Sequence, residues 1–255
     1  MASAAVSMQL FALSGIPLVQ PGDALCALIV AALKTSELSL QSGDVLVLAQ
    51  KIVSKSEGRY VELAGVEPSA RALELALLCN KDPRLVEVIL GESRGVVRAR
   101  RDVLVVEHRL GYVLANAGVD ASNVGDEGKV LLLPLDPDAS CRSLRAQLES
   151  ATGVAAGVLI NDSWGRAWRM GTTGTALGLA GVPGLEDLRG VPDLFGRRLR
   201  STDVAVADEL AAAASLLMGQ AGEGHPVILV RGFPYALRES SAAELLRPIA
   251  LDLFR

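Results

Sequence analysis

The sequence contains little cysteine, histidine or aromatic side chain, and each scarcity excludes a class of protein. The three cysteines, Cys26, Cys79 and Cys141, lie far apart and form no CxxC pair. A disulfide framework or a zinc site is therefore not expected, and the pattern fits a reducing cytoplasm. The two histidines, His108 and His225, are too few for a histidine-rich metal site. Aromatic residues make up 4% of the chain, which argues against a stacking platform for single-stranded nucleic acid.

Long apolar runs and basic patches are also missing. No stretch reaches the ~18 consecutive apolar residues that a membrane-spanning helix requires. The first positively charged side chain is Lys34, so the basic start of a signal peptide is absent. The formal net charge is -4, and the densest basic run, Arg98, Arg100 and Arg101, is interpreted as a solvated loop. We therefore predict a cytoplasmic protein that binds neither membrane nor nucleic acid.

The hydrophobic content is high enough for a large core. With 255 residues, 50% of them hydrophobic, the chain can form one large domain or two interlocked subdomains, with a weak candidate boundary between Asn80 and Arg101. Predicted strands and helices are interspersed without regular βαβ alternation, which indicates an α+β (mixed α/β) fold. The sequence has no GxxxxGK[ST] motif, and Gly178, Gly181 and Gly184 form no dinucleotide fingerprint, so neither a P-loop nor a Rossmann fold is expected.

The spacing of apolar residues and the positions of capping and turn residues predict the individual elements. We predict helices over residues 23–33, 68–80, 82–91, 140–150, 202–218 and 241–254. We predict strands over residues 45–49, 103–107, 112–115, 130–133, 157–160 and 227–230. Residues 171–184 form a glycine-rich segment after the fifth of these strands. Asp138 or Ser140 is the expected cap of the helix over 140–150, and Gly219 is the expected end of the helix over 202–218.

Two acidic motifs are the main candidates for chemistry. The strand over 112–115 runs into a turn that contains Asp120 and Asn123, and the strand over 157–160 ends at Asp162, which Ser163 follows. Each aspartate alone also fits ordinary turn or capping chemistry. Together, with Ser163 and Asn123 as neutral oxygen groups, the two aspartates could share a magnesium or manganese site that holds a phosphate.

Two lysines and a glycine-rich loop are candidates for binding phosphate or nucleotide. Lys51 and Lys55 lie beside the end of a predicted strand, where lysine can neutralise phosphate as a point charge. A solvated turn is the alternative, and the sequence alone favours it. Residues 218–225 either simply end the preceding helix or wrap a nucleotide, with Gln220 or Glu223 reaching a metal ion.

Four side chains that follow Asp162 have two interpretations each. Arg166 and Arg169 could bind phosphate or carboxylate bidentately, or they could form surface ion pairs. Trp164 and Trp168 could line a cleft for a planar ligand, although packing is the ordinary role of tryptophan.

The motifs occur in an order that resembles the coenzyme F420-0:L-glutamate ligase (γ-glutamyl ligase) family over nearly the whole chain. The matching segments are GIPL (residues 15–18), KIVSKSEGR (51–59), NAGVDASN (116–123), LPLDPD (133–138), NDSWGR (161–166), VADEL (206–210), LMGQ (217–220) and VRGF (230–233). A collinear set of this kind is far more specific than any single motif. The family commonly has Asp-Thr where this chain has Asp162 and Ser163, and serine keeps the hydroxyl. We expect a single ligase domain over residues 1–255, without the flavin-reductase-like domain of some relatives.

The resemblance implies a ligase that uses GTP to couple L-glutamate to the deazaflavin precursor coenzyme F420-0. The terminal carboxylate of the precursor would become an acyl phosphate, and the amino group of glutamate would then displace phosphate, leaving GDP as the other product. A second round would add a γ-linked glutamate. Two rival functions stay open: a related metal- and nucleotide-dependent ligase for another acid, and a non-catalytic protein that binds GTP or a deazaflavin.

The same resemblance assigns roles to the matching residues. Asp120, Asp162 and Lys55 would act in catalysis. The implied cofactors are two magnesium or manganese ions, with room for a potassium ion, and the metal ligands would be Asp120, Asp162, Ser163 and Gln220. Contacts with GTP would come from Gly15, Ile16, Pro17, Leu18, Gln50, Lys51, Lys55, Asn123, Met218, Gly219, Gln220, Ala221, Gly222, Glu223, Gly224 and His225. The implied fold has mixed sheets in two interlocked subdomains, is specific to the family and forms an intertwined homodimer.

Overall fold

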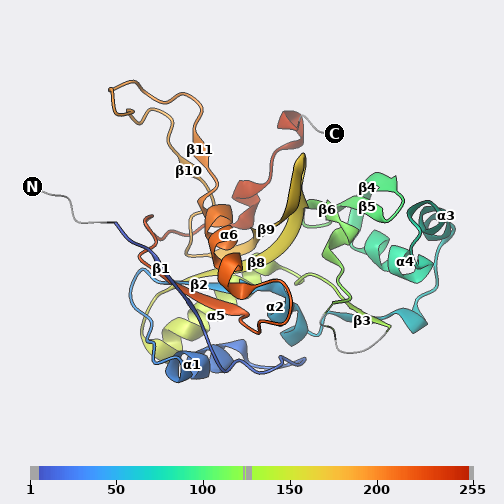
Figure 1. Ribbon diagram of the computed structural model, residues 1–255, viewed down its shortest axis with the longest axis horizontal. Coiled ribbons are helices and arrows are strands. Elements are labelled where there is room, and N and C mark those ends of the chain that lie inside the picture. Colours follow the sequence, from blue (N-terminus) through green and yellow to red (C-terminus); the bar gives the residue numbers. More distant parts are fainter. Residues whose placement is uncertain (1–5, 123, 125–127, 253–255) are drawn as a thin grey trace, which may run out of the picture.

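A five-stranded mixed sheet forms the centre of the protein (Figure 1). The structure is a computed structural model that describes residues 6–122, 124 and 128–252. The strand order is β1-β12-β2-β8-β9. The bounds of these strands are Gln9–Ala12 for β1, Val227–Arg231 for β12, Val45–Ala49 for β2, Gly157–Arg166 for β8 and Arg169–Ala180 for β9. Only β2 and β8 run parallel, so the sheet is neither a Rossmann nor a P-loop sheet, and the predicted α+β class is confirmed.

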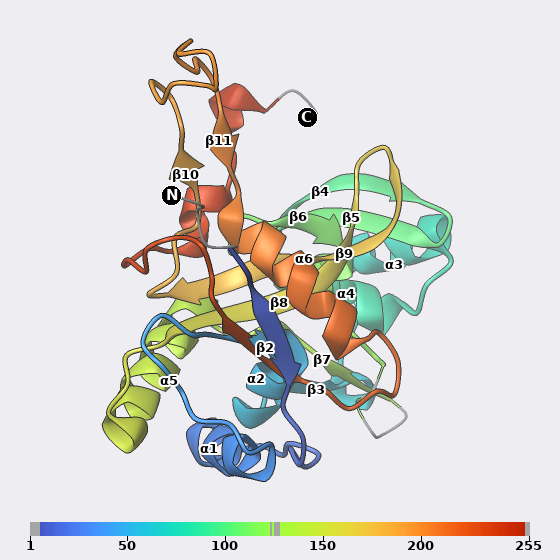
Figure 2. The same ribbon diagram turned by 60° about the vertical axis from the view of Figure 1, so that its left-hand side comes forward.

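Helices cover both faces of this sheet (Figure 2). Helix α6, Val206–Met218, packs on one face, and α1 (Leu25–Thr35), α2 (Gln50–Ser56) and α5 (Pro137–Thr152) pack on the other. Because side chains alternate along a strand, Val45 and Val47 of β2 contact the α6 layer while Leu46 and Leu48 contact the opposite layer. Burying each of these side chains contributes roughly 1.5–3 kcal/mol, which explains the unbroken apolar run of β2.

A smaller unit lies beside the main sheet and has its own core. It contains α3 (Ala70–Cys79), α4 (Pro83–Gly91) and a sheet of β4 (Ser93–Arg100), β5 (Val103–His108) and β6 (Val113–Ala115). Ser69 and Asp82 accept hydrogen bonds from the first turns of the two helices, and Pro83 occupies the first turn of α4. A two-stranded sheet of β3 (Tyr60–Glu62) and β7 (Lys129–Leu131) connects this unit to the chain around α2.

Several predicted elements are wrong, each for a physical reason. The helix expected over 241–254 is replaced, within the described residues, by two short 3-10 turns, η3 (Ala242–Leu245) and η4 (Ile249–Leu251), because Pro248 cannot continue a helix. The basic run around Arg98 lies on strand β4 rather than in a loop. The helix over 140–150 is capped by Asp136, whose carboxylate accepts a hydrogen bond from the amide of Ala139 (2.9 Å).

The glycine-rich segment over 171–184 is largely strand β9. Glycine is needed there because helices approach the sheet very closely. A Cβ atom on Gly174 would lie 2.4 Å from the carbonyl oxygen of Ala211 in α6, and one on Gly178 would lie 2.5 Å from the backbone of Pro137 in α5. The two glycines therefore let helices from both layers contact the same strand.

An arm that the sequence did not predict projects from the main body (Figures 1 and 2). Its base is the pairing of β10 (Glu186–Asp187) with β11 (Asp203–Val204), and its tip carries Leu194 and Phe195, which are 100% and 95% exposed. Consequently α6 begins at Val206, four residues later than predicted. No helix in the described part of the chain is long and apolar enough to cross a membrane.

Candidate functional site

A cavity of about 690 Å³ lies where the carboxyl end of β2 meets the loop that follows α6. Most of the predicted nucleotide contacts line it: Ile16, Pro17, Leu18, Gln50, Lys51, Lys55, Met218, Gly219, Gln220, Ala221, Gly222, Gly224 and His225. Three of the four predicted metal ligands, Asp162, Ser163 and Gln220, line it, whereas Asp120 is not in its wall. Gly15 and Glu223 are not in its wall; Glu223 instead accepts a hydrogen bond from the amide of Ala221 (2.8 Å). The predicted contact Asn123 lies outside the described residues.

Helix α2 presents two ammonium groups to this cavity. It begins at Gln50, directly after β2, so the solvated turn favoured by the sequence is wrong. Lys51 and Lys55 are four residues apart and therefore share one face of the helix. Both side chains are partly buried, and the pKa of Lys55 is lowered by burial and then by the charge of Lys51. Two cations at the wall of a concave site attract an anionic ligand such as a phosphate chain.

Asp120 is held against this helix from a different part of the chain. Its Oδ2 lies 2.7 Å from Nζ of Lys51, and its Oδ1 accepts a hydrogen bond from the amide of Ser122 (2.6 Å). Its backbone forms a bridge with Leu131. Burial opposes ionisation of Asp120, but the hydrogen bonds from Lys51 and Ser122 outweigh it, so the pKa of this carboxyl is lowered. Asp120 is therefore ionised at neutral pH.

A strained turn positions Asp120. Asn116, Ala117 and Gly118 form the 3-10 turn η2, and their φ angles are 54°, 54° and 67°. This left-handed conformation costs roughly 1–2 kcal/mol for each residue with a side chain, so surrounding structure must hold it. A Cβ on Gly118 would lie 2.8 Å from the side chain of Leu133, so only glycine fits. The sequence shows the glycine but not the strain.

Asp162 lies within β8 rather than at a strand end, because the strand continues to Arg166 and pairs with β9 throughout. Burial raises the pKa of Asp162 to about 6, although the Ser163 amide and the charge of Lys51 lower it; the charge of Asp120 raises it further. Both aspartates thus interact electrostatically with Lys51 and with each other. The structure brings together the two carboxylates that the sequence paired.

Ser163 and Gln220 are also brought together. The hydroxyl of Ser163 donates to Oε1 of Gln220 (2.7 Å) across the end of α6. That helix ends at Met218, and Gly219 follows it with a φ of 71°, as predicted. The loop from Gly219 onward therefore returns over β8.

This donor set suits a hard cation. It contains carboxylate, hydroxyl and amide oxygens, which magnesium and manganese prefer. Burial removes water from the Asp162 carboxylate, and a bound cation would offset the cost of this desolvation. Within the described residues, no group of three His, Cys, Asp or Glu side chains could hold a metal ion. Magnesium fits such a site, since it commonly binds one or two carboxylates and completes its shell with phosphates and water.

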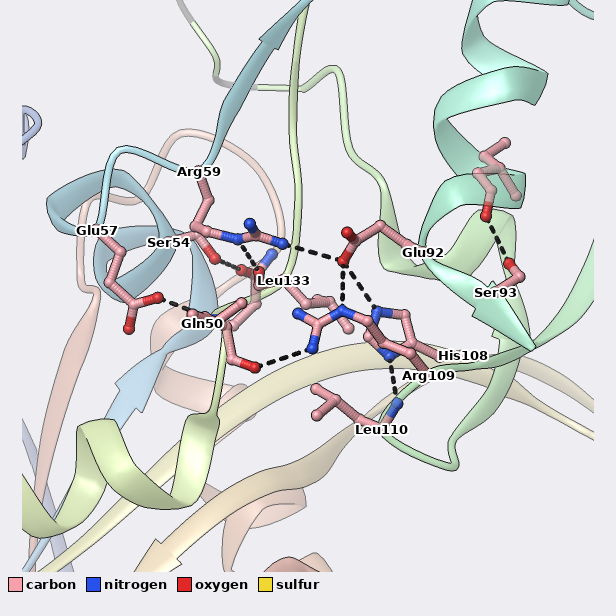
Figure 3. Close-up of polar contacts among 12 residues, drawn as sticks. Gln50, Ser54, Glu57, Arg59, Glu92, Ser93, His108, Arg109, Leu110 and Leu133 are labelled. Atoms are coloured by element: carbon pink, nitrogen blue, oxygen red, sulfur yellow. Dashed lines mark hydrogen bonds and ion pairs between the residues drawn. The ribbon is translucent and has the colours of Figure 1, made fainter. Parts of the chain in front are cut away.

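A partly buried ionic cluster that the sequence did not indicate lies next to α2 (Figure 3). Oε2 of Glu92 lies 3.0 Å from Arg59 Nη2, 3.1 Å from Arg109 Nε and 3.5 Å from His108 Nε2. These contacts, led by that with His108, outweigh burial and lower the pKa of Glu92 to about 2. Arg59 follows α2 and also donates to the carbonyl oxygen of Leu133 (2.9 Å), so the cluster ties α2 to the smaller unit.

The remaining candidates lie away from the cavity. Arg166 and Arg169 are exposed at the β8–β9 turn. Trp164 packs against Tyr112 with ring centroids 5.5 Å apart, so it has the packing role rather than the ligand-binding one. Trp168 is 80% exposed. None of these four side chains lines the cavity.

Comparisons with known proteins agree with the arrangement of these motifs. A family model described as F420-0:Gamma-glutamyl ligase matches residues 15–232. The chain is 47% identical to the coenzyme F420:L-glutamate ligase of Methanothermobacter thermautotrophicus, over 98% of this chain and all of that protein. It is 46% identical to the protein of the same name from Methanopyrus kandleri, over 93% of both chains. It is 42% identical to that from Archaeoglobus fulgidus, over 97% of this chain and 96% of the relative.

Proposed function

Since the chain belongs to the F420-0:gamma-glutamyl ligase family, we propose that it is a ligase that adds L-glutamate to coenzyme F420-0. Relatives that are 42–47% identical along almost their whole length carry the name coenzyme F420:L-glutamate ligase. The observation that carries the proposal is the shared cavity, which collects two lysines and the Asp162–Ser163 pair beside Asp120.

The nucleotide in this proposal is GTP. A carboxylate is a poor electrophile, so its oxygen must first take up a phosphoryl group, and the triphosphate supplies it while GDP departs. The nitrogen of glutamate then attacks the acyl carbon, the new C–N bond forms and phosphate leaves. Lys51 and Lys55 neutralise the phosphate chain, and the loops at 16–20 and 218–226 enclose the nucleotide. A second round extends the product by a γ-linked glutamate.

A divalent cation would supply further charge neutralisation when bound, and Asp120, Asp162, Ser163 and Gln220 would hold it. Two contacts support this assignment: Asp120 pairs with Lys51, and Ser163 donates a hydrogen bond to Gln220. Asp162, whose pKa is about 6, is mainly ionised at pH 7 and is ready to attract a cation.

A mass-spectrometric ligation assay tests the activity. Protein mixed with coenzyme F420-0, L-glutamate, GTP and manganese is expected to yield products heavier by one or more glutamyl residues. Omission of GTP or metal should abolish the product.

Lys55→Gln should lower the rate at least ~10-fold, because one phosphate-binding charge is lost, whereas Lys34→Gln, at an exposed site on α1, serves as the matched control. Product only with a different acid in place of the deazaflavin would favour the related ligase, and GTP binding without turnover would favour the non-catalytic protein.

The exposed arm supports a homodimer as the working form. Leu194 and Phe195 are adjacent apolar side chains, almost fully exposed on a projecting arm, and such a pair suits contact with a second subunit. We expect a solution mass of twice the 26.7 kDa of one chain by light scattering. Replacing both residues with serine should yield a monomer, whereas Leu77→Ser, at an equally exposed site on α3, should leave the mass unchanged. A monomeric native protein would refute the dimer while leaving the ligase proposal standing.

A further inference from the structure

Asn161 has one buried polar atom without a partner. The side chain is 5% exposed, and its Nδ2 donates to the hydroxyl oxygen of Ser215 (3.0 Å) and contacts the sulfur of Met218 (3.3 Å). Its Oδ1 finds no hydrogen-bond donor in the described part of the chain. Leaving a buried acceptor unpaired costs about 1–3 kcal/mol, and a ligand or a water molecule in the cavity would supply the missing donor.

This atom belongs to the wall of the functional cavity. Asn161 pairs with Ala49 of β2, and both residues line that cavity together with Asp162. Alternate residues of a strand share a face, and Asn161 and Ser163 both contact the end of α6, at Met218 and Gln220 respectively. Along β8, two residues span roughly 6.6 Å, so Oδ1 lies in the neighbourhood of the oxygens that would hold a cation.

The chemistry of the ligands narrows the choice of donor. Phosphate and carboxylate oxygens accept hydrogen bonds at neutral pH, so they cannot satisfy Oδ1, whereas N–H and O–H groups of the nucleotide or of glutamate could. The position of Asn161 beside Asp162 and Ser163 in the cavity wall favours a donor at the cation instead. The donor half of the amide is already used by α6, so Asn161 offers an acceptor alone. A water molecule bound to a cation points its lone pairs at the metal and its hydrogens outward, and magnesium keeps several such waters.

We propose that Asn161 accepts a hydrogen bond from a water molecule bound to the divalent cation, and that it acts as a positioning residue for that cation. This inference rests on the proposed function, which includes the cation. Residues that orient metal ligands or metal-bound water typically contribute 10–100-fold to metal affinity.

The test is a titration of the protein with manganese alone. The electron paramagnetic resonance signal of the free ion reports how much manganese stays unbound. Asn161→Leu keeps the size of the side chain and removes the acceptor, and it is expected to raise the Kd for manganese ~10–100-fold. Asn161→Asp restores an acceptor at the same place and should bind manganese at least as tightly as the native protein. Ser215→Ala removes the contact with α6 but keeps Oδ1, and should change the Kd less than ~3-fold.

Each alternative result has a distinct meaning. An unchanged Kd in Asn161→Leu would overturn the inference, and so would an equal loss in Asn161→Leu and Ser215→Ala, because Asn161 would then act only by fixing α6. If the native protein and an Asp162→Asn variant bind manganese equally poorly, the cation itself is refuted, and the proposed function loses its metal together with this inference. If native binding depends on Asp162 but not on Asn161, only the inference fails.

Discussion

An Asp162→Asn variant is expected to lose ligation activity by roughly 10³-fold or more while its fold becomes more stable. The variant keeps the shape of the side chain but removes the charge that would hold the cation. The same charge destabilises the folded protein, because burial raises the pKa of Asp162 to about 6 from an ordinary value of 3.8. Removing it should raise the free energy of unfolding by about 1–3 kcal/mol at pH 7.5 in the absence of metal.

The gain in stability has a defined pH dependence. A raised pKa means that the folded state binds the proton more tightly than the unfolded state does. The penalty is therefore complete above pH 6 and disappears as the pH falls toward 4. Urea denaturation of both proteins across this window measures the difference directly. A destabilised variant at pH 7.5, or a difference that does not change with pH, would contradict the prediction.

Asp120→Asn is the informative comparison. It should also abolish turnover, but it should lower the stability, because the pKa of Asp120 is lowered in the folded state by its contacts with Lys51 and Ser122. The two aspartates thus share a site and differ in the sign of their effect on folding. Retained activity in both variants would refute the metal assignment.

Glu92→Gln is expected to lower the free energy of unfolding by about 3–5 kcal/mol, the largest effect on stability that we predict. The Glu92 carboxylate is the common partner of Arg59, His108 and Arg109, and its side chain is 15% exposed. An amide cannot neutralise two partly buried guanidinium groups. Denaturant unfolding measures the loss, and Glu74→Gln, which breaks an exposed pair with Arg71 on α3, should cost less than ~1 kcal/mol.

The pH dependence of this effect has the opposite sign to that of Asp162. The pKa of Glu92 falls to about 2 from 4.5 on folding, so its contribution is complete above pH 4.5 and is lost as the pH falls toward 2. The native protein and the Glu92→Gln variant should therefore converge in stability at low pH. A constant difference down to pH 2 would show that the lost contacts are not ionic.

Sequence reasoning predicted those features that depend on local pattern. The apolar run of β2, the helix over 82–91 and the glycine after α6 each have a local physical signal, and each was placed correctly. The candidate site motifs could be proposed from the sequence because each is short and continuous.

The features that were missed depend on contacts between distant segments. Arg59, Glu92 and Arg109 are separated by 33 and 17 positions, and no periodicity links them. The glycines of β9 were seen only as a glycine-rich segment, because the sequence does not show that α5 and α6 approach the strand at these positions. The path of β8 through Asp162 depends on its pairing with β9, which a single polar segment does not reveal.

Because of the turn before Asp120, the segment that carries this aspartate cannot keep its conformation outside this fold. Its left-handed Asn116 and Ala117 are unfavourable in isolation. The turn is held by Leu133, which packs over Gly118, and by the bridge between Asp120 and Leu131. Leu133 is in turn fixed by Arg59, whose partner is Glu92 in the smaller unit. If the same residues were transferred to another loop, the carboxylate of Asp120 would be present but would no longer point toward Lys51. The motif therefore works only together with the core that surrounds it.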